Sequence, residues 1–163
     1  MHRNIRAAVA ALALVLAVAP AAMAATISES VTVNSVLTVT GIPASISYGT
    51  LDPGTTSGVQ SFTASVTANS GYTYRVSGSD FTGPGTIGKV NRESKLALAS
   101  GSTIASGLDN WTNFANSAYD GSNVVVTGNA GSSSFLTELR LTIPGATAPG
   151  SYSGSITYTF TAN

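Results

Sequence analysis

Carboxylates and aromatic side chains in residues 101–122 are the groups of this chain best suited to chemistry. Asp109 and Asp120 lie on either side of Trp111, the one tryptophan. Two facing carboxylates are the machinery of a glycoside hydrolase, and clustered carboxylates can hold calcium. Aspartate also commonly caps turns, and the other carboxylates are isolated in the sequence. We therefore expect both aspartates to cap turns, and we predict no catalytic, cofactor-binding or metal-binding residue.

Three aromatic residues in the same segment could instead form a contact surface. An exposed tryptophan between glycine-rich stretches can stack on a sugar ring, and it can also plug the open end of a β-sandwich. The candidate contacts to a glycan or a partner are Trp111, Phe114 and Tyr119.

The first 24 residues have the features of a signal peptide. Arg3 and Arg6 give a basic start, an apolar run covers residues 7–19, and Ala22-Met23-Ala24 is a small-x-small cleavage site. The alternative, a membrane anchor, needs a longer apolar run of about 20 residues. We expect cleavage after residue 24, a single domain over residues 25–163, and a product that is secreted, extracellular or associated with the cell envelope.

Composition after cleavage excludes several functions. The one histidine, His2, leaves with the signal peptide and cysteine is absent, so Ser-His and Cys-His nucleophiles and ordinary zinc sites are not expected. Five basic and seven acidic residues remain, too few and too scattered for nucleic acid or a membrane surface. No second hydrophobic span or sorting tail follows. We expect a protein that is not an enzyme, needs no cofactor, and is released or held non-covalently.

Alternation of apolar and hydroxyl residues indicates β structure along the chain. The expected strands cover residues 26–40, 46–48, 59–69, 72–77, 95–99, 123–128, 135–143 and 151–160, with one helical turn as the alternative for 95–99. Their apolar rows predict a mostly buried set: Phe62, Val66, Tyr72, Tyr74, Val76, Leu139, Leu141, Ile156, Tyr158 and Phe160. Residues 59–69 and 72–77 are predicted to form a hairpin, and "GNAGSSS" at 128–134 a flexible link. The pattern predicts an all-β, antiparallel, immunoglobulin-like sandwich of about 7–9 strands, with a closed barrel as the alternative.

The first expected strand is too long for a sandwich. Fifteen residues from Thr26 to Thr40 would span roughly 50 Å, whereas sandwich strands run ~17–20 Å. Glu29 lies on the apolar side of this segment, as charges on edge strands do. We expect Leu37 and Val39 in the core, with residues 26–33 either an edge strand guarded by Glu29 or held in reserve for a neighbouring subunit. A single strand bent across both sheets is the alternative.

Three stretches resemble bacterial exported sandwich domains: "SISYGTLDPGT" (45–55), "VTANSGYTYRVSGSDF" (66–81) and "LTIPGATAPGSYSGSITYTF" (141–160). The chain resembles WxL-type surface domains, with Tyr72 and Tyr158 where those have tryptophans. It is less closely similar to the spore-coat-U and fimbrial-subunit group, with Ala68 near the place of a cysteine. Both resemblances imply an exported, non-catalytic, envelope-associated protein.

The sequence thus favours a secreted structural or adhesive protein of the cell surface. It would be held non-covalently on the envelope or in an extracellular assembly. Its expected partners are a cell-wall polymer, other surface proteins, or further copies of itself. The alternative function is a carbohydrate-binding module that uses the Trp111 loop.

Overall fold

The computed structural model describes residues 28–98 and 102–163. The chain divides into two compact units, residues 1–32 and 33–163. Residues 28–32 of the first unit form no helix or strand. The predicted signal peptide, with Thr26 and Ile27, lies outside the described residues, as do Ala99, Ser100 and Gly101.

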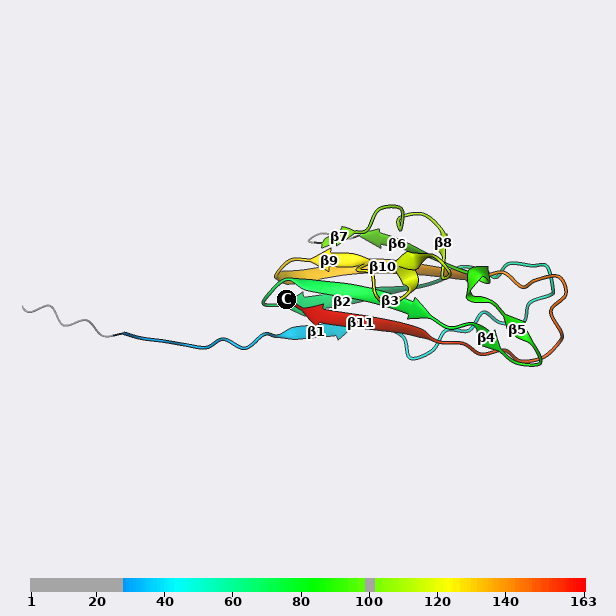
Figure 1. Ribbon diagram of the computed structural model, residues 1–163, viewed down its shortest axis with the longest axis horizontal. Coiled ribbons are helices and arrows are strands. Elements are labelled where there is room, and N and C mark those ends of the chain that lie inside the picture. Colours follow the sequence, from blue (N-terminus) through cyan, green and yellow to red (C-terminus); the bar gives the residue numbers. More distant parts are fainter. Residues whose placement is uncertain (1–27, 99–101) are drawn as a thin grey trace, which may run out of the picture. The chain divides into compact units, whose positions relative to one another are not determined.

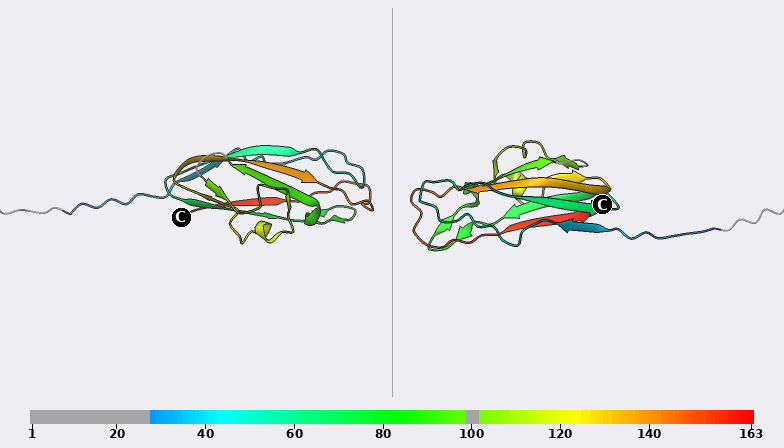
Figure 2. Two further views of the ribbon diagram at one scale, coloured as in Figure 1. Left: turned by 90° about the horizontal axis from the view of Figure 1, so that it is seen from above. Right: turned by 180° about the vertical axis from the view of Figure 1, so that it is seen from behind.

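The second unit is an all-β sandwich of two antiparallel sheets (Figures 1 and 2). The five-stranded sheet has the order β1 (Leu37–Thr40), β2 (Gln60–Ala68), β10 (Gly131–Leu141), β6 (Arg92–Leu98) and β8 (Thr112–Asn113). The four-stranded sheet has the order β11 (Ile156–Ala162), β3 (Tyr72–Gly78), β9 (Val126–Gly128) and β7 (Ser102–Ile104). β4 (Phe81–Thr82) pairs with β5 (Thr86–Ile87), and short 3₁₀ turns cover Lys89–Asn91 and Ser117–Tyr119. The predicted fold class is confirmed.

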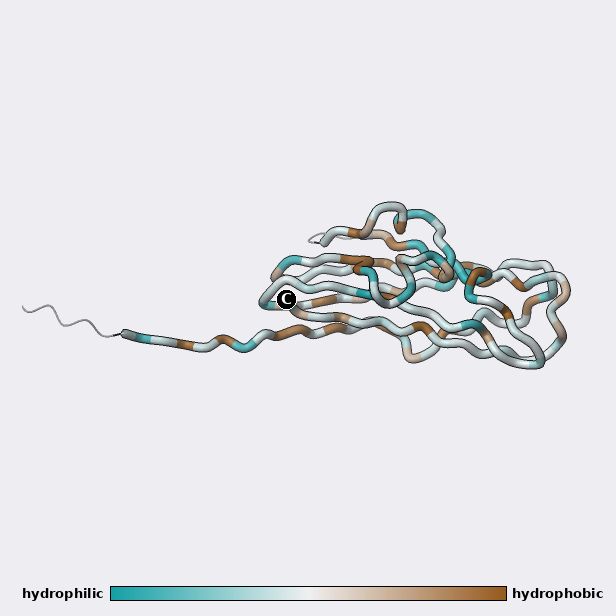
Figure 3. The backbone as a smooth tube through the Cα atoms, in the orientation of Figure 1, coloured by the Kyte–Doolittle hydropathy of each residue, from teal (hydrophilic) through white to brown (hydrophobic). Residues whose placement is uncertain are grey.

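Alternation explains why the central strands form where they do. On β2, Ala64, Val66 and Ala68 are buried while the residues between them are exposed. Figure 3 shows hydrophobic residues scattered along strands whose other residues are mostly near-neutral in hydropathy. The outward rows consist largely of hydroxyls, and one row crosses the whole four-stranded sheet through Thr161, Thr73, Thr127 and Thr103. Threonine suits this position because it favours β structure and stays hydrated.

Side-chain contacts between the layers show which strands face each other. Tyr74 on β3 stacks on Phe135 of β10 with ring centroids 5.0 Å apart, so β3 faces β10. Phe62 on β2 meets Tyr158 of β11 edge-on at 5.7 Å, so β11 faces β2. The core lies between these pairs. Of the side chains predicted to be mostly buried, six are at most 4% exposed: Val66, Tyr72, Tyr74, Val76, Leu139 and Leu141. The other four are only half-buried, because they lie on or face the edge strand β11: Phe62, Ile156, Tyr158 and Phe160.

The predicted hairpin is wrong. β2 and β3 belong to different sheets, and Asn69-Ser70-Gly71 carries the chain across the sandwich rather than between paired neighbours. Each strand has its own inward apolar row, and the two rows lie on opposite walls of the core. Strand periodicity alone does not distinguish this arrangement from pairing.

Two other local expectations also differ from the structure. Ile46 and Tyr48 lie in a loop, although both side chains pack half-buried against the core. The link expected to be flexible is partly strand, because β10 begins at Gly131. Ser132 and Ser134 pair with Thr67 and Ser65 of β2, so backbone hydrogen bonds fix a segment that shows little apolar pattern.

The long N-terminal segment becomes a strand only at Leu37. Leu37 and Val39 pack half-buried against the core, as expected. Just before them, the Asn69 side chain accepts a hydrogen bond from Val36 N at 2.7 Å and donates one to Asn34 O at 2.8 Å. These bonds hold residues 34–36 in line with β1.

Candidate functional site

Trp111 lies on the outer face of the five-stranded sheet, not at an open end of the sandwich. It directly precedes β8, and its half-buried indole ring is covered on one side by Arg140 of β10. The guanidinium carbon is 4.3 Å from the ring centroid, the geometry of a cation–π contact. A ligand that stacks on Trp111 would therefore use the other ring face.

Charged residues beside Trp111 form two ion pairs across β6 and β10. Arg140 Nε donates to Glu93 Oε2 at 2.6 Å, and Lys95 Nζ is 3.2 Å from Glu138 Oε2. Both pairs join residues directly opposite each other in the sheet register. The four side chains thus pair mainly with one another, and Glu93 also fixes the guanidinium that supports Trp111.

Phe114 and Tyr119 do not accompany Trp111 on the surface. Both are 1% exposed, and their rings stack on each other in the core with centroids 4.7 Å apart. Asn116 caps the 3₁₀ turn at Ser117–Tyr119 by accepting a bond from Ala118 N at 2.9 Å, which positions Tyr119. Their rings are not available to a ligand in this structure, so the predicted contact surface is reduced to Trp111.

The two aspartates near Trp111 are used differently. Asp120 Oδ1 accepts bonds from Ser122 N at 2.7 Å and Asn123 N at 3.2 Å, which confirms the expected turn cap. Asp109 is exposed and accepts a bond from the Asn110 side chain at 3.2 Å. Among residues 28–98 and 102–163, no group of three or more His, Cys, Asp or Glu side chains could hold a metal ion.

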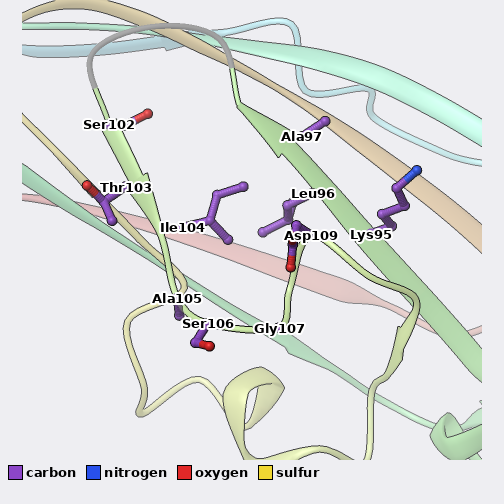
Figure 4. Close-up of a pocket in the computed structure, with 10 residues that line it drawn as sticks. All are labelled: Lys95, Leu96, Ala97, Ser102, Thr103, Ile104, Ala105, Ser106, Gly107 and Asp109. Atoms are coloured by element: carbon purple, nitrogen blue, oxygen red, sulfur yellow. The ribbon is translucent and has the colours of Figure 1, made fainter.

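A cleft of about 490 Å³ lies at the β6 and β7 side of the sandwich (Figure 4). Leu96 and Ile104 point toward each other from its two walls, while Lys95 points away. Asp109 also lines it. The cleft therefore presents an apolar floor with one carboxylate at its rim and no pair of facing carboxylates from the described residues.

Arg92 is a buried cation that sequence reasoning missed. It is 1% exposed, and its Nη2 donates to Ser79 O at 3.0 Å and Ser155 O at 3.1 Å. Its guanidinium also lies 4.4 Å from the Phe114 ring centroid and 5.0 Å from that of Phe81. Burial lowers the pKa of Arg92, and the nearby hydroxyl of Tyr48 opposes that shift. One sign of this burial is present in the sequence: Arg92 is spaced by two residues from Ser94 and by four from Leu96, so the three side chains lie on the same, inward face of β6.

Half-buried Tyr48 and Tyr158 lie near this cation, and Tyr74 and Tyr119 are buried in the core. Burial raises the pKa of Tyr48, Tyr119 and Tyr158, and it raises the pKa of Tyr74 well above its ordinary value. In the described part of the chain, the hydroxyls of Tyr48 and Tyr158 have no hydrogen-bond partner. These groups stay protonated at neutral pH, so they offer no base for catalysis.

No protein-family model matches the chain, and no curated protein matches it. The chain is similar to part of a solved structure of a family 123 glycoside hydrolase from Clostridium perfringens, an enzyme of glycolipid glycan hydrolysis. The sequence identity is 22% and the TM-score is 0.38. The match covers 68% of this chain and 19% of that one. In the described residues, no helix is long and apolar enough to cross a membrane.

Proposed function

We propose that the chain is a secreted, non-catalytic structural or adhesive protein of the bacterial surface. It is held non-covalently on the envelope or within an extracellular assembly. Its partners are cell-wall polymer, other surface proteins or further copies of itself. The resemblance to WxL-type domains and, less closely, to the spore-coat-U and fimbrial group is consistent with this role.

The observation that carries the proposal is how the carboxylates are used. Glu93 and Glu138 pair with Arg140 and Lys95, Asp120 caps a turn, and Asp80 Oδ1 accepts the backbone N–H of Lys89 at 2.6 Å. General acid–base catalysis needs carboxylates that face a substrate and exchange protons with it. Four of the seven Asp and Glu side chains thus stabilise strands or turns, and hydroxyl rows cover much of the sheets. Both features suit a rigid building role.

A second candidate, a carbohydrate-binding module, is favoured by the position of Trp111. Its half-buried ring lies at the surface, and sugars stack on such rings while neighbouring polar groups bind their hydroxyls. Here the polar neighbours would be Arg140 and Glu93, which already pair with each other. A sugar would have to share those groups.

Binding to purified cell wall and to soluble polysaccharides separates the two candidates. We expect wall binding or self-association that survives Trp111→Ala, with Val90→Ala as a control because Val90 is an exposed apolar residue elsewhere. Thermal melts would check that both variants fold. Affinity for a soluble glycan that is lost in Trp111→Ala alone would favour the carbohydrate-binding module instead.

A further inference from the structure

The cleft between β6 and β7, which Trp111 does not line, has the character of a small-molecule binding site. Such sites are clefts of several hundred Å³, mostly apolar, with a few placed polar groups, and this cleft has a volume of about 490 Å³. Leu96 and Ile104 point toward each other across it (Figure 4). A ligand that fills the cleft would therefore place an apolar portion between these two side chains.

Backbone hydrogen bonds fix the loop that runs from the β7 wall of the cleft to the β6 wall. Ala105 N, directly after β7, donates to Val125 O at 2.9 Å, and Leu96 N of β6 donates to Leu108 O at 2.8 Å. Within the loop, Leu108 N donates to Ala105 O at 3.3 Å, and the Leu108 side chain is 2% exposed. Asp109, the next residue, is thus held beside the Leu96 wall.

Asp109 brings a negative charge to this cleft. The side chain is exposed, and its Oδ1 accepts a bond from Asn110 Nδ2 at 3.2 Å, which orients the carboxylate. Neither ion pair of the described residues includes it. Among the described residues that line the cleft, Lys95 is the one cation, and it points away and pairs with Glu138 at 3.2 Å. The cleft therefore combines an apolar floor with one carboxylate that no lining cation neutralises.

This combination selects among classes of ligand. Fatty acids and phosphates are anionic, so the carboxylate would repel them. An oligosaccharide needs polar partners along its whole length, which the apolar floor does not provide. The remaining polar side chains that line the cleft are uncharged hydroxyls: Ser102, Thr103 and Ser106. A cation on a chain of methylene groups matches both features, because such stems lie along apolar surface while the charged end stays at a carboxylate or in water.

We propose that the cleft binds an alkylammonium group, that is, a chain of several methylene groups that ends in a protonated amine. The methylene groups pack between Leu96 and Ile104, and the ammonium pairs with Asp109. Lysine side chains of a partner polypeptide and free linear amines share this chemistry. The inference goes beyond the proposed function and does not depend on it, because the cleft would bind such a group wherever the protein is located.

Three matched probes test the chemistry of the ligand. Pentylamine, pentanol and pentanoate have the same chain length and differ in the charge at one end. Pentylamine should shift the methyl NMR signals of Leu96 and Ile104, whereas those of Leu37, at the opposite edge of the five-stranded sheet, should not move. We expect pentylamine to bind at least roughly tenfold more tightly than pentanoate, and its affinity should fall as salt is raised, because salt screens the ion pair.

Two aspartate variants test the role of the carboxylate. Asp109→Asn keeps the size of the side chain and removes its charge, so it should lower the affinity for pentylamine by about tenfold. Asp52→Asn is the control, because it makes the same change in net charge at an exposed turn outside the cleft, and the affinity should stay within about twofold. Ile104→Thr makes one wall polar and should weaken pentylamine and pentanol alike. Thermal melts would check that the variants fold.

A lysine with both backbone ends blocked distinguishes the two sources of the ligand. If it binds as well as pentylamine, the cleft takes lysine side chains, and if pentylamine alone binds, the cleft takes free amines; both results support the proposal. The proposal is overturned if no probe binds at the cleft, if the three probes bind equally well, or if the two aspartate variants behave alike. Location is tested separately: a surface protein that binds no amine contradicts this inference alone, and an amine-binding protein of the cytosol contradicts the proposed function alone.

Discussion

Gly78→Ala should destabilise the sandwich, because the end of β3 is packed directly against two buried side chains. A Cβ at Gly78 would overlap Arg92 Nη2 and lie 2.5 Å from Phe114 Cδ1. Arg92 and Phe114 are each 1% exposed, so neither can swing into solvent to make room. Overpacking a core of this kind costs about 1–3 kcal/mol.

The loss should fall toward the upper end of that range. Displacing the guanidinium would lengthen the bonds from Arg92 to Ser79 O and Ser155 O, and hydrogen bonds to charged groups each contribute about 1.5–3 kcal/mol. We expect the free energy of unfolding to fall by roughly 2–3 kcal/mol. Gly58→Ala is the control, since nothing lies within 4 Å of its added Cβ. That variant should be neutral or stabilise by up to about 1 kcal/mol.

Urea denaturation of both variants measures the difference in their free energies of unfolding. The slope of the unfolding free energy against urea concentration should be unchanged. Phe114→Leu in the Gly78→Ala background should recover part of the loss, because it removes the ring atom that Cβ meets, and a double-mutant cycle would show that coupling. Equal stability of Gly78→Ala and Gly58→Ala would refute the packing described for Arg92.

Three further predictions concern the C-terminal strand, the tyrosines and metal ions. Phe160→Ala should lower the free energy of unfolding by about 1.5–3 kcal/mol, measured by urea denaturation. The loss is smaller than for a fully buried phenylalanine because the ring is half-buried, although it stacks on Tyr74 with centroids 4.6 Å apart. Thr159→Ala is the control, with an expected change below about 0.5 kcal/mol, and an equally small change for Phe160→Ala would contradict the prediction. Burial raises the tyrosine pKa values, so the folded chain keeps protons that the unfolded chain loses above about pH 10. The free energy of unfolding should be unaffected below that pH and fall above it by about 1.4 kcal/mol per pH unit for each such tyrosine, and a flat profile of urea midpoints to about pH 11 would argue against this. EDTA should leave the melting temperature unchanged, whereas a shift of several degrees would indicate that Asp109 and Asp120 hold a metal ion.

Local alternation was sufficient to predict the fold class and most inward rows. Val66 and Tyr74 lie in strands where apolar and polar residues alternate, and Leu139 lies in a strand where Thr137 interrupts the inward apolar row. All three are at most 1% exposed. Strand partners are not encoded in that period, which is why residues 59–77 were predicted to form a hairpin. Phe62, Ile156, Tyr158 and Phe160 share the inward pattern, yet they are half-buried because edge position depends on the order of the sheets.

The candidate site was predictable only in part. Turn capping by Asp120 follows from its own chemistry and was foreseen. The separation of Phe114 and Tyr119 from Trp111 depends on a 3₁₀ turn and on a core position beside Arg92, neither of which has a local sequence signal. From the sequence "RESKLAL" alone, Arg92 would be taken for a solvent-facing residue. Only the register of β6 in the sheet shows that its side chain points into the core.

Fractionation of the cells that make this protein tests the central claim most directly. The protein would be followed by antibody through cytosol, culture medium, wall and high-molecular-weight extracellular material. The account predicts that it is found with the wall or in assembled material, that denaturant alone releases it, and that Trp111→Ala does not change its distribution. Protein that is found in the cytosol, or free in the medium as a monomer, would contradict the proposal of a non-covalently held surface protein.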